Sequence, residues 1–102
     1  NNMKKIVLLC AAGMSTSMLV TKMRAAAEAE GVACNIDAYG LSEASAMIPS
    51  AACVLLGPQV RFHLQKLQQQ YPSVPMASID MRMYGSMDGK GVFQQALKLI
   101  GE

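Results

Sequence analysis

Cys10 and the residues that follow it make up the stretch of this chain with the clearest chemical proposal. Cys10 ends an apolar run, and the seven residues directly after it are small or carry a hydroxyl, apart from one methionine: Ala11, Ala12, Gly13, Met14, Ser15, Thr16 and Ser17. A thiol between a strand and the start of a helix faces backbone N–H groups and the positive end of the helix, which stabilise a thiolate. The same groups would hold a phosphate attached to the sulfur. The stretch therefore predicts a thiolate or a phosphorylated thiol at Cys10.

The loop after Cys10 offers hydrogen-bond donors without any positively charged side chain. Backbone N–H groups of residues 12–17, with the hydroxyls of Ser15, Thr16 and Ser17, can form a nest for a dianion. The helix macrodipole adds roughly 0.3–1 kcal/mol, or up to about 2 kcal/mol where the site is partly buried. The alternative is that Cys10 is a small buried hydrophobe and the hydroxyls merely cap a helix. That alternative is favoured for Cys34 and Cys53, which lie within apolar strand patterns.

Length and composition restrict the class of protein. A chain of 102 residues predicts a single domain over residues 1–102, and 52% hydrophobic with 16% charged residues is typical of a globular protein. Three widely spaced cysteines favour a reducing cytoplasm without a disulfide framework. One histidine and no acidic cluster predict no metal site, and a net charge of +2 predicts no nucleic-acid partner. The apolar stretches are too short for a transmembrane helix.

Apolar runs that alternate with helical patterns predict a parallel sheet. Residues 4–9 are a polar start of two lysines followed by a continuous apolar run, and residues 52–56 are a second unbroken apolar run; both are typical of central strands covered on both faces. Alternation over residues 32–39 predicts a half-buried edge strand, and residues 76–79 predict a weaker fourth strand. We therefore expect an α/β fold, a single three-layer domain with a four-stranded parallel sheet in the order 2-1-3-4.

The connecting segments predict the helices. A helix begins at Ser15 or Thr16 and ends at Gly31. A short helix starts at Ser42 and ends before Pro49, and another follows Pro58. The glycines near the carboxyl terminus predict a loose loop before the last helix; they are Gly85, Gly89 and Gly91. In such a sheet the ligand crevice lies at the carboxyl ends of strands one and three, where Cys10 and residues 57–59 fall.

The segment from residue 10 to residue 20 resembles the active-site segment of the IIB components of the bacterial phosphoenolpyruvate-dependent sugar phosphotransferase system, of the lactose, cellobiose and chitobiose type. The octapeptide from Cys10 is the specific part of the resemblance. Supporting stretches extend it over essentially the whole chain; they are residues 22–24, 54–60, 79–80, 83–85, 88–89 and 91–92.

The resemblance implies a phosphorelay. A IIA partner carries phosphate on a histidine, Cys10 accepts it as a phosphocysteine, and the membrane IIC component passes it to an incoming disaccharide. Residues 11–17 would hold the phosphoryl oxygens, and no cofactor is required. The fold would be similar to that of the low-molecular-weight tyrosine phosphatases. The chain would lie in the cytoplasm, at the inner face of the membrane through IIC.

Two other classes of function stay open. A phosphatase-like hydrolase needs Cys-x5-Arg, but that position is Thr16, and Asp80 is the one acid that can be proposed for it. A redox or interaction module would use Cys10 as an oxidation sensor, with Cys34 or Cys53 approaching it in the fold. Further residues have an undecided place near the site or on the surface: Gln59, Arg61, His63, Arg82, Tyr84 and Met18.

Overall fold

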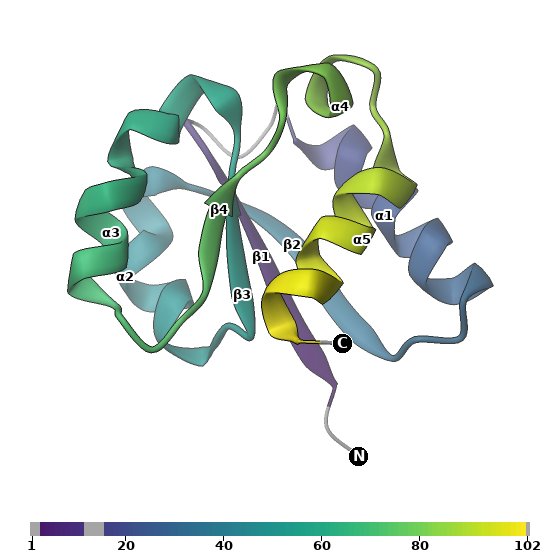
Figure 1. Ribbon diagram of the computed structural model, residues 1–102, viewed down its shortest axis with the longest axis horizontal. Coiled ribbons are helices and arrows are strands. Elements are labelled where there is room, and N and C mark those ends of the chain that lie inside the picture. Colours follow the sequence, from purple (N-terminus) through teal and green to yellow (C-terminus); the bar gives the residue numbers. More distant parts are fainter. Residues whose placement is uncertain (1–2, 12–15, 102) are drawn as a thin grey trace.

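The computed structural model describes residues 3–11 and 16–101 and has three layers (Figure 1). The middle layer is a parallel four-stranded sheet in the order β2-β1-β3-β4, as predicted. Helices α1 and α5 cover one face, and α2 and α3 cover the other (Figure 1). The strands are β1 (Lys4–Cys10), β2 (Cys34–Gly40), β3 (Cys53–Leu56) and β4 (Met76–Ser78). The helices are α1 (Ser17–Ala29), α2 (Ala44–Met47), α3 (Leu64–Gln70), α4 (Met81–Gly85) and α5 (Gly89–Ile100).

The two central strands are buried because both of their faces are covered. In β1, Ile6 and Leu8 face the apolar cluster under α1 and α5, whereas Val7 and Leu9 face the cluster under α2 and α3. All four side chains are fully buried. Each such side chain contributes roughly 1.5–3 kcal/mol relative to exposure to water. The unbroken apolar run in the sequence is therefore the signature of a strand that serves two cores.

Helix α1 is the direct continuation of the loop after Cys10. It buries a stripe that includes Leu19, Met23 and Ala27 against the sheet. The chain leaves the helix at Gly31, whose φ of +71° suits a residue without a Cβ, and the Val32 N–H then donates to the Ala27 carbonyl at 3.0 Å. The predicted start and end of this helix are both confirmed to within a residue or two.

Helix α5 packs on α1 through a close backbone approach. A Cβ placed on Gly89 would lie 2.5 Å from the backbone carbonyl carbon of Lys22, a separation that side chains do not tolerate. The first turn of α5 can therefore contact α1 only because residue 89 is glycine. This contact supports α1 from its flank, within the layer that both helices form on one face of the sheet (Figure 1).

The prediction of a loose loop around Gly85, Gly89 and Gly91 is wrong. Helix α4 ends with Gly85, and the other two glycines lie within the first turn of α5. Two aspartates explain the difference. The Asp80 carboxylate accepts hydrogen bonds from the backbone of residues 82 and 83, and the Asp88 carboxylate accepts one from the Gly91 N–H at 2.9 Å. These N-caps start the helices despite the low helix propensity of glycine.

The other face is built from shorter helical pieces. Helix α2 ends at Met47, before Pro49 as predicted, and it is flanked by the 3₁₀ turns η1 (Leu41–Glu43) and η2 (Ile48–Ser50), the second of which contains Pro49. A proline fits there because the N–H that it lacks would have no partner in a first turn. The 3₁₀ segment η3 (Pro58–His63) precedes α3 and is kinked at Val60. Within residues 3–11 and 16–101, no helix has the length and apolar character that a membrane span requires.

Candidate functional site

Cys10 is the last residue of β1 and lies at the carboxyl edge of the sheet, the edge where the parallel strands end. Its side chain is fully buried. Strand β3 ends beside it, because Leu9 pairs with Leu56 and the Gly57 N–H donates to the Leu9 carbonyl at 2.8 Å. The predicted meeting of Cys10 with the segment after β3 is confirmed.

Thr16 contacts the sulfur of Cys10 directly. The Thr16 hydroxyl donates a hydrogen bond to Cys10 Sγ, with 3.6 Å between oxygen and sulfur. Its side chain is fully buried, and in the part of the chain that the structure describes it is the one polar residue in that class. The distance fits a hydrogen bond to sulfur, whose radius exceeds that of oxygen. The thiol therefore has a hydroxyl donor built into its surroundings.

This hydroxyl does not cap helix α1, contrary to one of the two sequence predictions. Thr16 occupies the N-cap position, and its carbonyl accepts the Val20 N–H at 2.9 Å, but its side chain makes no capping hydrogen bond. The reason is its backbone conformation, φ −99° and ψ −3°, which is helical and not the extended form that presents a side-chain oxygen to the first N–H groups. Ser15, the other predicted cap, lies outside the described residues.

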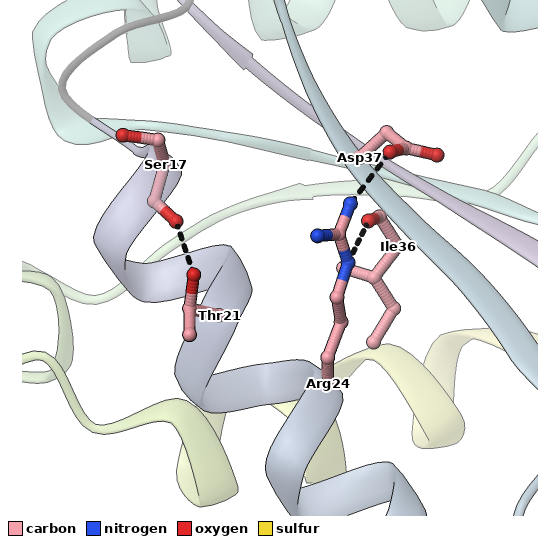
Figure 2. A network of polar contacts seen from close by, with 5 residues as sticks. All are labelled: Ser17, Thr21, Arg24, Ile36 and Asp37. Atoms are coloured by element: carbon pink, nitrogen blue, oxygen red, sulfur yellow. Dashed lines mark hydrogen bonds and ion pairs between the residues drawn. The ribbon is translucent and has the colours of Figure 1, made fainter.

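The loop that would bind phosphate is described at its two ends. Ala11 is exposed directly after Cys10, and Ser17 is exposed as the first residue of α1. The Ser17 carbonyl accepts a hydrogen bond from the Thr21 hydroxyl at 3.2 Å (Figure 2). The remaining predicted phosphate ligands lie outside the described residues: Ala12, Gly13, Met14 and Ser15. Binding of a phosphoryl group by residues 11–17 stays a prediction.

Arg24 ties α1 to the edge strand β2. Its Nε donates to the Ile36 carbonyl at 2.9 Å and one of its terminal nitrogens lies 2.7 Å from Asp37 Oδ1 (Figure 2). The two charged side chains are 55% and 42% exposed, so the ion pair contributes about 0–1 kcal/mol. Its effect is geometric, because it fixes how α1 lies along the strand.

Gln59 and Tyr84 converge on the same edge of the sheet from two elements. A Cβ on the buried Gly57 would lie 3.0 Å from Gln59 Oε1 and 3.6 Å from Tyr84 Cε1. Both side chains thus approach the end of β3, beside the end of β1. The sequence left these residues undecided, and the structure places them next to the segment that carries Cys10.

Asp80 has a structural role. Its Oδ2 accepts the N–H groups of Arg82 at 3.1 Å and Met83 at 3.3 Å, which makes it the N-cap of α4. The one acid proposed for a hydrolase is therefore used to start a helix.

Exposed side chains surround the site on the elements that begin at this edge. Met18, Phe62 and Met81 are 63%, 75% and 64% exposed, so Met18 is not a core residue. His63 is half-buried and lies against the Phe62 ring, with 4.3 Å between the ring centroids. Arg61 and Arg82 are exposed, and Arg61 Nη1 contacts Met81 Sδ at 3.9 Å.

The other two cysteines lie at the opposite edge of the sheet. Cys34 begins β2 and pairs with Lys4, and Cys53 begins β3 and pairs with Ile6. A strand rises about 3.3 Å per residue, which separates Cys10 from the level of Cys53 by about 13 Å, well beyond the reach of a disulfide. Burial raises the pKa of Cys34, and it raises the pKa of Cys53 to about 12. Neither thiol is placed to be a redox partner of Cys10.

A three-layer parallel α/β domain with a buried cysteine where its first central strand meets a helix defines a class of small cysteine-loop proteins. The chain belongs within it to the family of lactose/cellobiose-specific IIB subunits of the PTS system, whose pattern it matches over residues 5–95. Membership of this family gives the chain a role in the sugar phosphotransferase system.

Relatives with similar sequences share almost the full length of the chain. It is 46% identical over 101 residues to the oligo-beta-mannoside-specific EIIB component of Bacillus subtilis (strain 168), covering 96% of this chain and 97% of the relative. It is 39% identical over 104 residues to the cellobiose-specific EIIB component of Lactococcus lactis subsp. lactis (strain IL1403), with 95% and 96% covered. The galactose-specific EIIB component of Lactococcus lactis subsp. cremoris (strain MG1363) has the same identity and coverage.

Solved structures share the fold. The cellobiose-specific IIB component from Borrelia burgdorferi superimposes with a TM-score of 0.81 at 33% identity, over 97% of this chain and 93% of that one. The lactose-specific IIB domain from Streptococcus pneumoniae superimposes with a TM-score of 0.84 over 95% and 97% of the two chains. At 15% identity, the second likeness concerns the fold alone.

Proposed function

We propose that this chain is a phosphocarrier that moves a phosphoryl group from a phosphohistidine on a IIA component, through Cys10, to a disaccharide held by a membrane IIC component. The single observation that supports it best is the buried thiol at the carboxyl edge of the sheet, with the Thr16 hydroxyl donated to its sulfur. Family membership supplies the reaction class. The chain would act as a protein-phosphohistidine–sugar phosphotransferase at the cytoplasmic face of the membrane.

The proposed reaction has two displacements at phosphorus. First, the Cys10 thiolate attacks the phosphoryl group; the S–P bond forms, the P–N bond to the donor histidine breaks, and its electron pair stays on the imidazole. Second, a sugar hydroxyl oxygen attacks; the O–P bond forms, the S–P bond breaks, and the electron pair returns to the sulfur. The hydroxyl proton passes to a base on the acceptor side. The chain itself ends each cycle unchanged.

The surroundings of Cys10 support a relay more than a hydrolase. A phosphatase loop of this length ends in an arginine that stabilises the transferring group, whereas this chain has Thr16 there. Asp80, the acid proposed for hydrolysis, caps α4 instead. A carrier benefits from these features because its phosphocysteine must last until the next partner arrives. Residues 11–17 would hold the phosphoryl oxygens meanwhile.

The acceptor is proposed at the level of a class. The relatives are named for oligo-beta-mannoside, galactose and cellobiose, so closely similar IIB chains serve different sugars. A disaccharide of the cellobiose, chitobiose or lactose type fits this range.

Phosphorylation can be measured directly. The chain is incubated with phosphoenolpyruvate, the general relay proteins and a panel of disaccharide-type IIA partners, and the modified residue is identified by mass spectrometry under conditions that preserve phosphocysteine. We expect phosphate on Cys10, none on Cys10→Ser, and normal labelling of Cys34→Ser, the matched control at the opposite edge of the sheet.

Two results would contradict the proposal. One is a failure to label with every IIA partner while the chain is folded. The other is rapid release of inorganic phosphate without any acceptor, which would indicate a hydrolase. Label that persists in Cys10→Ser would move the site to another residue.

A further inference from the structure

The Thr16 hydroxyl donates its hydrogen bond to the sulfur of Cys10. It is fully buried, it caps no helix N–H group, and its oxygen lies 3.6 Å from Sγ. A hydroxyl hydrogen bond to a neutral sulfur is weak, whereas one to a thiolate is charge-assisted and stronger. The hydroxyl therefore favours the state in which the sulfur carries a negative charge.

We propose that Thr16 is a catalytic residue that stabilises the Cys10 thiolate, and so assists the departure of sulfur when the phosphoryl group passes to its acceptor. In that step the acceptor oxygen forms the O–P bond, the S–P bond breaks, and the electron pair develops on Sγ, where the Thr16 hydroxyl already points. Thr16 keeps its own proton throughout. The catalytic part of this inference rests on the proposed function; the effect on the thiolate does not.

This role differs from the one predicted for Thr16 from the sequence. As a phosphate ligand, Thr16 would contact phosphoryl oxygens and have no influence on the unphosphorylated thiol. As a donor to sulfur, it acts on the empty site as well. The pH dependence of Cys10 reactivity in the unphosphorylated chain therefore separates the two roles.

The thiolate test uses Thr16→Val, which keeps the branched shape and removes the hydroxyl, and Thr16→Ser, which restores a hydroxyl. The rate of Cys10 alkylation by iodoacetamide is followed against pH by peptide mass spectrometry. We expect the midpoint for Thr16→Val to lie about one pH unit above that of the parent chain, the size expected for the loss of one hydrogen bond to a charged group. The Thr16→Ser midpoint should return toward the parent value.

Internal references and a matched control make the measurement specific. Cys34 and Cys53 are alkylated in the same samples, and their raised pKa values keep their midpoints above the neutral range. Thr21→Val removes the hydroxyl of the threonine within α1, which donates to the Ser17 carbonyl and not to sulfur. It should leave the Cys10 midpoint in place.

Transfer kinetics test the catalytic part. Discharge of phosphorylated chain to IIC and disaccharide should slow by about 10- to 100-fold in Thr16→Val and recover in Thr16→Ser. Unchanged midpoints in folded Thr16→Val would overturn the inference, as would a Thr16→Ser variant that behaves like Thr16→Val. If circular dichroism shows that Thr16→Val is unfolded, Thr16→Ala gives the same readouts without the branched side chain.

The proposed relay and the proposed role of Thr16 can be refuted independently of each other. Absence of phosphate on Cys10 would remove the relay, while the alkylation midpoints would still decide whether Thr16 stabilises the thiolate. A shifted midpoint with unchanged discharge rates would overturn the catalytic role and leave the relay intact.

Discussion

Cys10 and Cys53 are both fully buried cysteines on adjacent central strands, yet their surroundings are opposite. Cys53 is the first residue of β3 and packs in the apolar cluster under α1 and α5, where burial raises its pKa to about 12. Cys10 is the last residue of β1, and a threonine hydroxyl donates to its sulfur. Burial in apolar surroundings therefore disfavours the thiolate form of a cysteine. At the carboxyl edge of the sheet, a hydroxyl that donates a hydrogen bond to the sulfur stabilises the charged thiolate form.

The largest difference between the two cysteines should appear in phosphoryl transfer. Cys10→Ser should lose at least about 10³-fold in phosphorylation by the IIA partner, because the nucleophile is replaced. Cys53→Ala should be phosphorylated as readily as the parent chain. Radiolabel incorporation per folded molecule provides the measurement. Equal losses of phosphorylation in Cys10→Ser and Cys53→Ala would contradict the comparison and indicate that both variants lose label because they misfold.

Alkylation should give the next largest difference. At pH 8 a thiol with a pKa near 12 has about 10³-fold less thiolate than one with the ordinary value of 9.0, so Cys53 should react far more slowly than a free cysteine. Peptide mass spectrometry after timed exposure of the folded chain to iodoacetamide reads both sites at once. Modification of Cys53 at the rate of a free thiol would contradict the burial argument.

Gly89→Ala should damage the side of the sheet that holds Cys53. The new Cβ would meet the Lys22 backbone, so α5 and α1 must separate, at a cost of about 1–3 kcal/mol in the free energy of unfolding. Urea denaturation measures this loss, and Cys53 alkylation should accelerate with it. Gly85→Ala is the matched control, because nothing lies within 4 Å of a Cβ at that position. A Gly89→Ala variant as stable as Gly85→Ala would refute the contact.

The smallest effect is the alkaline stability of Cys53. The folded pKa of about 12 exceeds the unfolded value of 9.0, so the contribution of this thiol to stability is complete below pH 9 and is lost as the pH rises toward 12. Cys53→Ala should be less stable by about 1 kcal/mol near pH 7, and the gap should close above pH 9. Urea denaturation at several pH values, with the variant as reference, follows the gap. A stability difference between the parent chain and Cys53→Ala that does not change with pH would contradict the raised pKa of Cys53.

The strand order and the place of Cys10 could be predicted because they follow from burial. A strand covered on both faces must be apolar throughout, and the two apolar runs therefore identify the centre of the sheet. The starts of α4 and α5 could not be predicted in this way. Gly85, Gly89 and Gly91 are typical of a loop, and only the positions of Asp80 and Asp88 before a helical segment signal an N-cap.

The role of Thr16 was inaccessible to sequence patterns for a different reason. A hydroxyl at a helix start caps the helix in most contexts, and the pattern is the same whether it does so or not. The outcome depends on the backbone angles of one residue, which turn the Thr16 side chain toward sulfur. Arg24 is a similar case, since its partners on β2 are distant in sequence.

The contact of Gly89 with α1 has a consequence for how the protein is made. Cys10, Thr16 and Lys22 leave the ribosome early, whereas the helix that packs against Lys22 is among the later segments to be synthesised. Until α5 emerges, α1 lacks the helix that packs beside it on the same face of the sheet, and the helix that begins next to Cys10 is not held in place. We expect Cys10 of a nascent chain to become reactive only after translation has supplied α5, the helix that holds α1 in place.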